Sequence, residues 1–292
     1  KPKVNYQTMQ TASNINKTKV NELGKIDFDL SFFNIFKLKE INVNVISKTK
    51  VIPMGNAIGM KLYTDGVLVV GMSENSGIKE GDRIVQIDKK AIDNTEDLME
   101  AVNKCSGKEI SVKYIRDNTT ITTSIKPIKN SGNQYKIGLW VRDAAAGVGT
   151  LTFYEPSSGM FGTLGHGILD VDTSELIKIA NGELVTTNIL NITKGKKGDP
   201  GEIRGTIESG HTIGNIDKNT SFGVFGTLNK TPYINIQNND EIEVALREEI
   251  KIEDAQIICE LENGKREKYN IKIQKVFLNN NKDNKSMLIK IT

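Results

Sequence analysis

Apolar and polar residues alternate with a period of two along much of this chain, which is the pattern of β-strands that bury one face. The alternation is first clear at Ile26–Leu30, where the intervening positions are acidic, and again at Ile41–Val45, where they are Asn. The preceding residues, 1–24, are polar, rich in Asn, Thr and Lys, and without periodicity. We therefore predict that residues 1–50 form a linker or loosely docked arm followed by strands.

A helical pattern interrupts the strands of a first compact unit, which we place at residues 51–130. Asn94 or Thr95 provides the N-terminal cap, acidic residues follow in the first turn, and Gly107 ends the helix. Four residues fall on one apolar stripe of this helix: Leu98, Ala101, Val102 and Cys105. The strands expected in this unit are Ile58–Leu62, Val67–Val70, Arg83–Ile87, Glu109–Arg116 and Thr119–Lys126.

The turn at Ser76–Val85 has the sequence SGIKEGDRIV. Gly77 and Gly81 take backbone angles that a side chain would oppose, and Asp82 can accept hydrogen bonds from the turn's own amides. This turn and the order of elements resemble a PDZ domain of the bacterial protease type, a small α+β domain. The resemblance implies that an extended peptide, such as a peptide carboxyl terminus, adds as a strand to an exposed edge beside the helix. The implied peptide-binding residues are Ile58, Gly59, Met60, Lys61 and Leu62.

From about Ile137 onward the chain is rich in glycine and in short apolar runs, with no long amphipathic helix between them. We place a second domain at residues 131–292 and expect a β-barrel or sandwich, so that the chain as a whole is mostly β. The expected strands are Gly147–Tyr154, Phe161–Gly167, Leu184–Thr193, Gly201–Glu208, Gly223–Leu228, Glu241–Ala245, Ala255–Leu261, Tyr269–Val276 and Met287–Ile291.

The composition is that of a globular protein, with 37% hydrophobic and 26% charged residues. The formal net charge is +3 and no run of five like charges occurs, so neither nucleic acid nor a membrane surface is indicated as a partner. The sequence contains no signal peptide or transmembrane run, the longest apolar stretch being Val67–Val70. Because it starts at Lys1 without a Met, we interpret it as a fragment from which an amino-terminal anchor could have been removed.

The cysteines and histidines are too few and too scattered to indicate a metal site. Cys105 and Cys259 have apolar or small neighbours, so we expect two buried, unpaired thiols rather than a disulfide or a nucleophile. Neither cysteine has the spacing of a metal ligand, and the two histidines are 45 positions apart. A zinc peptidase is therefore not indicated, and no metal or cofactor is expected.

His166 is the stronger of the two candidates for a general base. It lies between Gly165 and Gly167 at the end of an apolar strand, where backbone and substrate can approach the imidazole closely. His211, in a polar turn, fits a surface or structural role better. None of the serines after His166 stands in a Gly-x-Ser-Gly turn that would expose its hydroxyl beside an oxyanion hole; they are Ser174, Ser209, Ser221 and Ser286. The residues alone leave the enzyme incomplete.

A series of short segments carries a second resemblance. They are Leu38–Glu40, Val51–Gly55, Asp65–Gly71, Gly147–Tyr154, Gly162–His166, Asp170–Thr173, Gly198–Glu202 and Ser221–Leu228. In this order they resemble the stage IV sporulation protein B peptidase family of endospore-forming bacteria. That family combines a membrane anchor, a PDZ domain and a trypsin-like serine peptidase domain, so a trypsin-like β-barrel is implied for the second domain. His166 matches the family's catalytic histidine.

The resemblance implies a serine endopeptidase of sporulation signalling in the extracytoplasmic space between mother cell and forespore. Such an enzyme first cuts its own chain to leave the membrane anchor, and then clips the extracytoplasmic part of an inhibitory membrane protease complex. That cut activates an intramembrane metalloprotease and, through it, a late sigma factor. The implied partners are protein substrates, this membrane complex and its own chain, with His166 accepting the proton of the nucleophilic serine.

The family's acid and its Gly-x-Ser-Gly nucleophile turn follow the segment matched here by Lys285–Thr292. We therefore expect a peptidase domain that is incomplete at its carboxyl end, and an inert polypeptide if it consists of residues 1–292 alone. The loop Met72–Ser76 is also shorter than is common in the family. These departures leave open the alternative of a non-catalytic PDZ-type peptide-binding adaptor. A broad quality-control protease is rejected, because its triad would precede the PDZ domain and residues 1–50 contain no histidine.

Overall fold

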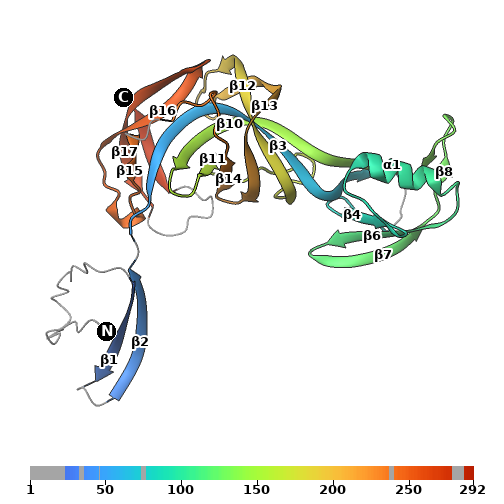
Figure 1. The fold of residues 1–292 in the computed structure, drawn as a ribbon, viewed down its shortest axis with the longest axis horizontal. Coiled ribbons are helices and arrows are strands. Elements are labelled where there is room, and N and C mark those ends of the chain that lie inside the picture. The colour runs from blue at the N-terminus through green and yellow to red at the C-terminus, as the bar shows by residue number, and fades with distance from the viewer. Residues whose placement is uncertain (1–23, 33–35, 46, 74–76, 237–239, 278–285) are drawn as a thin grey trace. The chain divides into compact units, whose positions relative to one another are not determined.

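A computed structural model describes residues 24–32, 36–45, 47–73, 77–236, 240–277 and 286–292 of the protein. The chain divides into two compact units, residues 1–49 and residues 50–292. In the first unit, β1 (Gly24–Phe32) and β2 (Phe36–Val45) form an antiparallel two-stranded sheet (Figure 1). The two strands predicted in this region are confirmed, whereas residues 1–23 of the predicted arm lie outside the described residues.

The second unit is mostly β, as predicted, and α1 (Thr95–Lys104) is the one α-helix among its described residues. Its longest strand is β3 (Lys50–Met72). The other strands are β4 (Arg83–Ile87), β5 (Lys90–Ala91), β6 (Ile110–Arg116), β7 (Thr119–Ile125), β8 (Ile128–Lys129), β9 (Tyr135–Lys136), β10 (Leu139–Glu155), β11 (Met160–Thr163), β12 (Ile179–Thr193), β13 (Glu202–Thr220), β14 (Gly223–Leu228), β15 (Ile242–Glu243), β16 (Asp254–Glu262), β17 (Lys265–Val276) and β18 (Met287–Ile291).

The strand β3 is paired on both of its edges. β10 runs antiparallel to it over most of its length, and β12 pairs with the opposite edge at Gly59–Thr64. From β12 the pairing continues through β13, β14 and β11 and returns to β10, so that six strands are joined in a closed ring. The second domain is therefore rich in β-strands, as predicted, while the trypsin-like β-barrel stays a prediction.

The remaining strands extend from this ring. The far end of β3 pairs with β4, which continues the sheet through β6 to β7 beside α1. The strands β16, β17 and β18 form a separate antiparallel sheet, and β15 pairs with the beginning of β3. A single long strand thus belongs to both the closed ring and the PDZ part of the chain (Figure 1).

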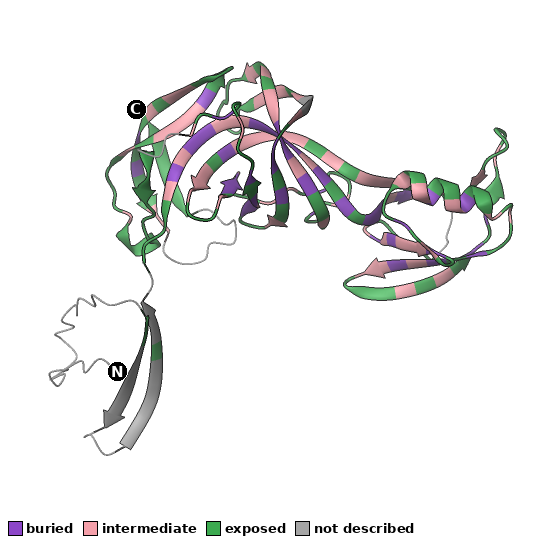
Figure 2. Ribbon diagram, in the orientation of Figure 1, coloured by how far each residue is buried: buried purple, intermediate pink, exposed green. Residues whose placement is uncertain are grey.

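The buried residues of β3 belong to two hydrophobic clusters, one in the closed ring of strands and one in the PDZ part. Figure 2 shows buried positions along this strand. The ring cluster includes Ile52, Met54, Ile58, Met60, Leu62, Leu151, Phe161, Leu184, Ile213, Ile216, Val224, Leu228 and Ile234. The PDZ cluster includes Val67, Val69, Ile78, Ile84, Ile87, Ile92, Leu98, Val102, Ile110, Val112, Tyr114 and Ile125. The change from one core to the other therefore falls within β3, between Leu62 and Val67.

The helix has the boundaries and the buried stripe that the sequence predicts. Asn94 is its N-cap, and the Asn94 side chain accepts a hydrogen bond from the Asp97 N–H at 2.8 Å. Leu98 and Val102 are buried in the PDZ cluster. In the part of the chain that the structure describes, no helix is long and apolar enough to cross a membrane.

The glycine-rich PDZ turn also has the predicted conformation. Gly77 and Gly81 have φ angles of +78° and +88°, in the region that favours glycine. The buried carboxylate of Asp82 accepts a hydrogen bond from the Lys79 N–H at 2.7 Å. The same carboxylate accepts two hydrogen bonds from the Arg116 guanidinium, at 2.7 and 2.6 Å, which compensate its burial.

Candidate active site

His166 follows β11 at a reversal of the chain that backbone contacts hold in place. Leu164 has a φ of +59°, a left-handed conformation that is unfavourable for a residue with a side chain. The Leu164 N–H donates to the Thr150 carbonyl at 3.1 Å, and the Thr152 hydroxyl donates to the Leu164 carbonyl at 3.0 Å. These bonds to β10 offset the strain and leave the His166 side chain exposed beyond the end of β11.

The His166 ring has one contact that bears on its protonation. Its Nδ1 lies 3.0 Å from the carbonyl oxygen of Gly167. Because a carbonyl oxygen accepts and does not donate, a hydrogen bond here requires the proton on Nδ1, and in the neutral ring Nε2 is then the acceptor. No serine hydroxyl of the described residues is hydrogen-bonded to this ring. The tautomer is the one that a general base needs for accepting a proton at Nε2.

The two glycines beside His166 are not equivalent. A Cβ atom on Gly165 would have no heavy atom within 4 Å. A Cβ atom on Gly167 would lie 2.6 Å from the Thr220 carbonyl oxygen and would collide with the Leu176 side chain. Close approach of the backbone is therefore found at Gly167, while Gly165 faces open space.

Asn219, on β13, holds both ends of the loop that follows His166. Its Oδ1 accepts a hydrogen bond from the Ile168 N–H at 2.9 Å, and its Nδ2 donates to the carbonyls of Ile168 and Ile177, each at 2.9 Å. One side chain thus holds the loop of residues 168–177 against β13, a strand of the closed ring. No sequence pattern marks Asn219 as part of the site, because its partners are backbone groups that only the fold brings near it.

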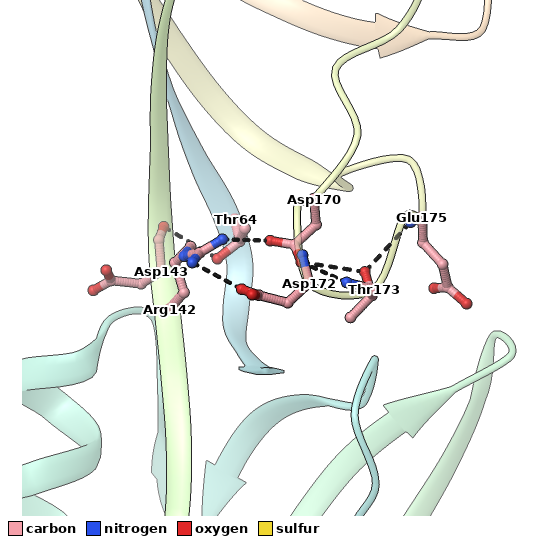
Figure 3. A network of polar contacts seen from close by, with 7 residues as sticks. All are labelled: Thr64, Arg142, Asp143, Asp170, Asp172, Thr173 and Glu175. Atoms are coloured by element: carbon pink, nitrogen blue, oxygen red, sulfur yellow. Dashed lines mark hydrogen bonds and ion pairs between the residues drawn. The ribbon is translucent and has the colours of Figure 1, made fainter. Parts of the chain in front are cut away.

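Arg142, on β10, holds the tip of the same loop, as Figure 3 shows. Its guanidinium donates to the Asp170 carboxylate at 2.8 Å and to the Asp172 carboxylate at 2.9 Å. The Asp170 side chain is buried and also accepts hydrogen bonds from the N–H groups of Asp172 and Thr173, each at 3.0 Å. A buried carboxylate requires such partners, so the network determines the shape of the loop after His166.

The pKa of Asp170 is lowered from the ordinary value of an aspartate. Burial, the largest single influence, raises this pKa, but hydrogen bonds from the N–H groups of Thr173 and Asp172 and the charge of Arg142 together outweigh it. A carboxyl group whose pKa is lower in the folded state stabilises the fold at pH values above its unfolded pKa. This stability is lost as the pH falls through the folded-state pKa.

We expect the free energy of unfolding to fall as the pH drops below about 4, the ordinary pKa of an aspartate. In Asp170→Asn this dependence should be weaker, because the amide does not titrate, and the stability at neutral pH should be lower. Thermal midpoints from about pH 6 to pH 3 test this, with Asp199→Asn as the control because Asp199 is exposed. If the thermal midpoints of wild type and Asp170→Asn fall equally with decreasing pH, the lowered pKa of Asp170 does not explain the loss of stability in acid.

Asp143, the residue after Arg142, connects β10 to the helix α1. The Asp143 carboxylate accepts hydrogen bonds from the N–H and the hydroxyl of Thr95, at 2.7 and 2.6 Å, in the first turn of α1. Burial, the largest influence, raises the pKa of Asp143, but these bonds from Thr95 outweigh it and the pKa is lowered. Adjacent residues of β10 therefore hold α1 and the loop after His166, a connection that the sequence analysis did not predict.

A cavity of about 440 Å³ opens beside His166. The His166 side chain is exposed and lines this cavity. Apart from His166, the lining residues are apolar or glycine: Met60, Leu62, Ala145, Ala146, Gly147, Val148, Leu164, Gly167, Ile168 and Leu169. The cavity lies between β10 and the chain segment around His166, so the candidate base stands at the edge of an apolar space.

The predicted peptide-binding edge is wrong for this structure. Ile58–Leu62 pairs with β10 along one side, and most of the segment pairs with β12 along the other. The side chains of Ile58, Met60 and Leu62 are only 1%, 2% and 1% exposed and belong to the ring cluster. A strand paired on both edges has no row of free backbone groups, so Ile58, Gly59, Met60, Lys61 and Leu62 cannot take up a further strand there.

The other candidate residues lie apart from this site. His211 packs against Tyr233, with ring centroids 4.5 Å apart, and does not line the cavity. Cys105 and Cys259 are both free, as predicted, but each is half-buried and not fully buried as expected. Burial, followed by the charge of Glu260, raises the pKa of the Cys259 thiol, which disfavours a nucleophilic thiolate. Within the described ranges, no group of three His, Cys, Asp or Glu residues is placed to hold a metal ion.

Comparisons with known proteins match both halves of the second unit. The family model described as SpoIVB peptidase S55 matches residues 133–292, more than half of the chain, and the PDZ domain model matches residues 57–126. Among solved structures, a crystal structure of the PDZ domain of an SdrC-like protein from Listeria monocytogenes is 19% identical, with a TM-score of 0.25. That match covers 26% of this chain and 87% of the other. No curated protein matches.

Proposed function

Because this chain belongs to the SpoIVB peptidase S55 family, we propose that it is a sporulation serine endopeptidase whose general base is His166. Membership of the family, together with the PDZ domain, makes the chain a serine peptidase that handles peptide or protein substrates. The observation that carries the role of His166 is its position: an exposed imidazole at the edge of an apolar cavity, on a segment held by Asn219 and Arg142.

In the proposed mechanism, Nε2 of His166 accepts the proton of a serine hydroxyl as that oxygen attacks the substrate carbonyl carbon. The imidazolium then returns the proton to the leaving amine. The contact of Nδ1 with the Gly167 carbonyl supports this assignment, because it favours the tautomer with a free lone pair on Nε2. The serine and the acid that complete such a mechanism are not assigned to any residue of this chain.

The finer part of the proposal follows the family. The enzyme first cuts its own chain, which releases it from a membrane anchor, and then cuts the extracytoplasmic segment of an inhibitory membrane protease complex. It acts in the space between forespore and mother cell, and the cut activates an intramembrane protease and a late sigma factor. The test is removal of the His166 imidazole from the full-length protein, with cleavage of its own chain as the readout.

The alternative function, a non-catalytic PDZ-type adaptor, depends on an open groove beside Ile58–Leu62. In this structure β10 occupies one edge of that strand and β12 the other. We therefore expect peptides with free carboxyl termini to bind at this strand with a Kd above about 1 mM, and any peptide binding to use another surface.

Titration of residues 50–292 with labelled carboxyl-terminal peptides, followed by fluorescence anisotropy and by backbone amide shifts, tests this expectation. The same peptides with amidated carboxyl termini are the control. Saturable micromolar binding that shifts the amides of Ile58–Leu62 and requires the free carboxylate would contradict it and restore the adaptor function.

A further inference from the structure

We infer that the apolar cavity beside His166 binds an uncharged, apolar side chain of the substrate, from a residue next to the bond that is cut. This inference rests on the proposed function and adds the substrate class to it. Every lining residue other than His166 is apolar or glycine. A charged substrate side chain would lose its hydration there without gaining an ionic partner, whereas an aliphatic or aromatic one would gain contact area.

The strand β10 forms one wall of this cavity with unusually small residues. Ala145, Ala146 and Gly147 follow one another along the lining. A Cβ atom added to Gly147 would meet no heavy atom within 4 Å, so the space in front of it is empty. At Gly149, two positions further on, a Cβ atom would lie 2.6 Å from Met60 Cε and 2.8 Å from a Leu164 methyl carbon. The protein fills the space at Gly149 with its own side chains and leaves it open at Gly147.

The backbone beside this wall is available to a substrate. β10 pairs with β3 along one edge, but with β11 on its other edge only from Leu151 onward. Among the described strands, none pairs with that second edge at Ala145–Val148. An extended substrate segment can therefore hydrogen-bond to this edge as an added strand, which would place alternate side chains toward the cavity. The geometry makes Gly147 a specificity-determining residue.

The test uses the full-length protein and a library of peptides that vary at each position around the cleaved bond. We expect wild type to prefer Leu, Val, Met or Phe at one of the positions flanking the bond, and to disfavour Asp and Lys there. Gly147→Val should lower kcat/KM for the Leu and Phe peptides by roughly 10- to 200-fold relative to the Ala peptide, because the added methyl groups occupy the space of the substrate side chain.

Ala144→Val is the matched control, because Ala144 lies on the same strand, is exposed, and does not line the cavity. It should keep the wild-type preference. If Gly147→Val does not fold, Val148→Ala serves instead, since it enlarges the cavity and should shift the preference toward Phe and Trp. Thermal midpoints report whether each variant is folded.

The outcomes separate this inference from the proposed function. Cleavage with a preference for a charged residue at every flanking position, or identical profiles for wild type and Gly147→Val, would overturn the role of the cavity and leave the peptidase proposal standing. Cleavage that persists without the His166 imidazole would overturn the proposed function. The inference is supported if Gly147→Val has a lower kcat/KM for the Leu and Phe peptides relative to the Ala peptide, while Ala144→Val keeps the wild-type peptide preference.

Discussion

Full-length protein carrying His166→Ala is expected to lose self-cleavage, with a rate at least roughly 10²- to 10⁴-fold below that of wild type. The reason is that no other imidazole lines the apolar cavity, so the variant has no imidazole there to accept the serine proton. The thermal midpoint should stay close to that of wild type, because the His166 side chain is exposed and its recorded contact is to its own neighbour. Gel analysis of the processed chain over time measures the first effect, and thermal unfolding measures the second.

His211→Ala is the control for this experiment. Its ring packs on Tyr233 away from the cavity, so the variant should be processed at a normal rate even if its stability is lower. Normal processing of His166→Ala, or loss of processing only in His211→Ala, would remove His166 from the mechanism. A large fall in the thermal midpoint of His166→Ala would instead assign it a structural role.

Gly167→Ala is expected to have the second-largest effect. The new Cβ atom would lie 2.6 Å from the Thr220 carbonyl oxygen, a backbone atom that cannot move aside without shifting β13. We expect a loss of about 1–3 kcal/mol in the free energy of unfolding. We also expect peptidase activity to fall by about 10²-fold, because the clash displaces the adjacent imidazole by a distance on the order of 1 Å. Denaturant unfolding and the rate of self-cleavage measure the two effects.

Gly165→Ala provides the matched control for stability. It makes the same chemical change on the other side of His166, but its Cβ atom would have no heavy atom within 4 Å. Its free energy of unfolding should remain within about 0.5 kcal/mol of wild type. If both alanine variants lose the same free energy of unfolding, the contact between Gly167 and Thr220 does not explain the loss of stability in Gly167→Ala.

Much of the fold follows from local sequence. Alternation of apolar and polar residues predicts the strands, because side chains on a strand point to opposite faces and only one face is buried. The helix after Asn94 and the turn at Gly77 and Gly81 were also predicted, since capping and positive φ depend on residues near in sequence. His166 was identified in the same way, from its flanking glycines and the end of an apolar run.

The partners of each strand were decided only by the tertiary structure. Ile58–Leu62 has the alternation of a strand, but this pattern states which face is buried and says nothing about what pairs with the two edges. The resemblance to a PDZ domain implied that one edge takes up a peptide, whereas β10 and β12 occupy both edges. Every residue has a backbone carbonyl, and every residue except proline has a backbone N–H. The side chains of a strand therefore do not indicate whether its edge is paired with another strand.

The environment of His166 was also decided only by the tertiary structure. Asn219 and Arg142 hold the loop after it through contacts with residues far away in sequence, and neither lies in a pattern that indicates a site. Gly147 and Gly149 look alike in the sequence, yet one faces a cavity and the other is filled by Met60 and Leu164. The sequence by itself determined the strands, the PDZ turn and the candidate base. Only the packing of distant segments decided which glycine opens a binding space and which strand edge is closed, because space and pairing depend on neighbours that local sequence does not encode.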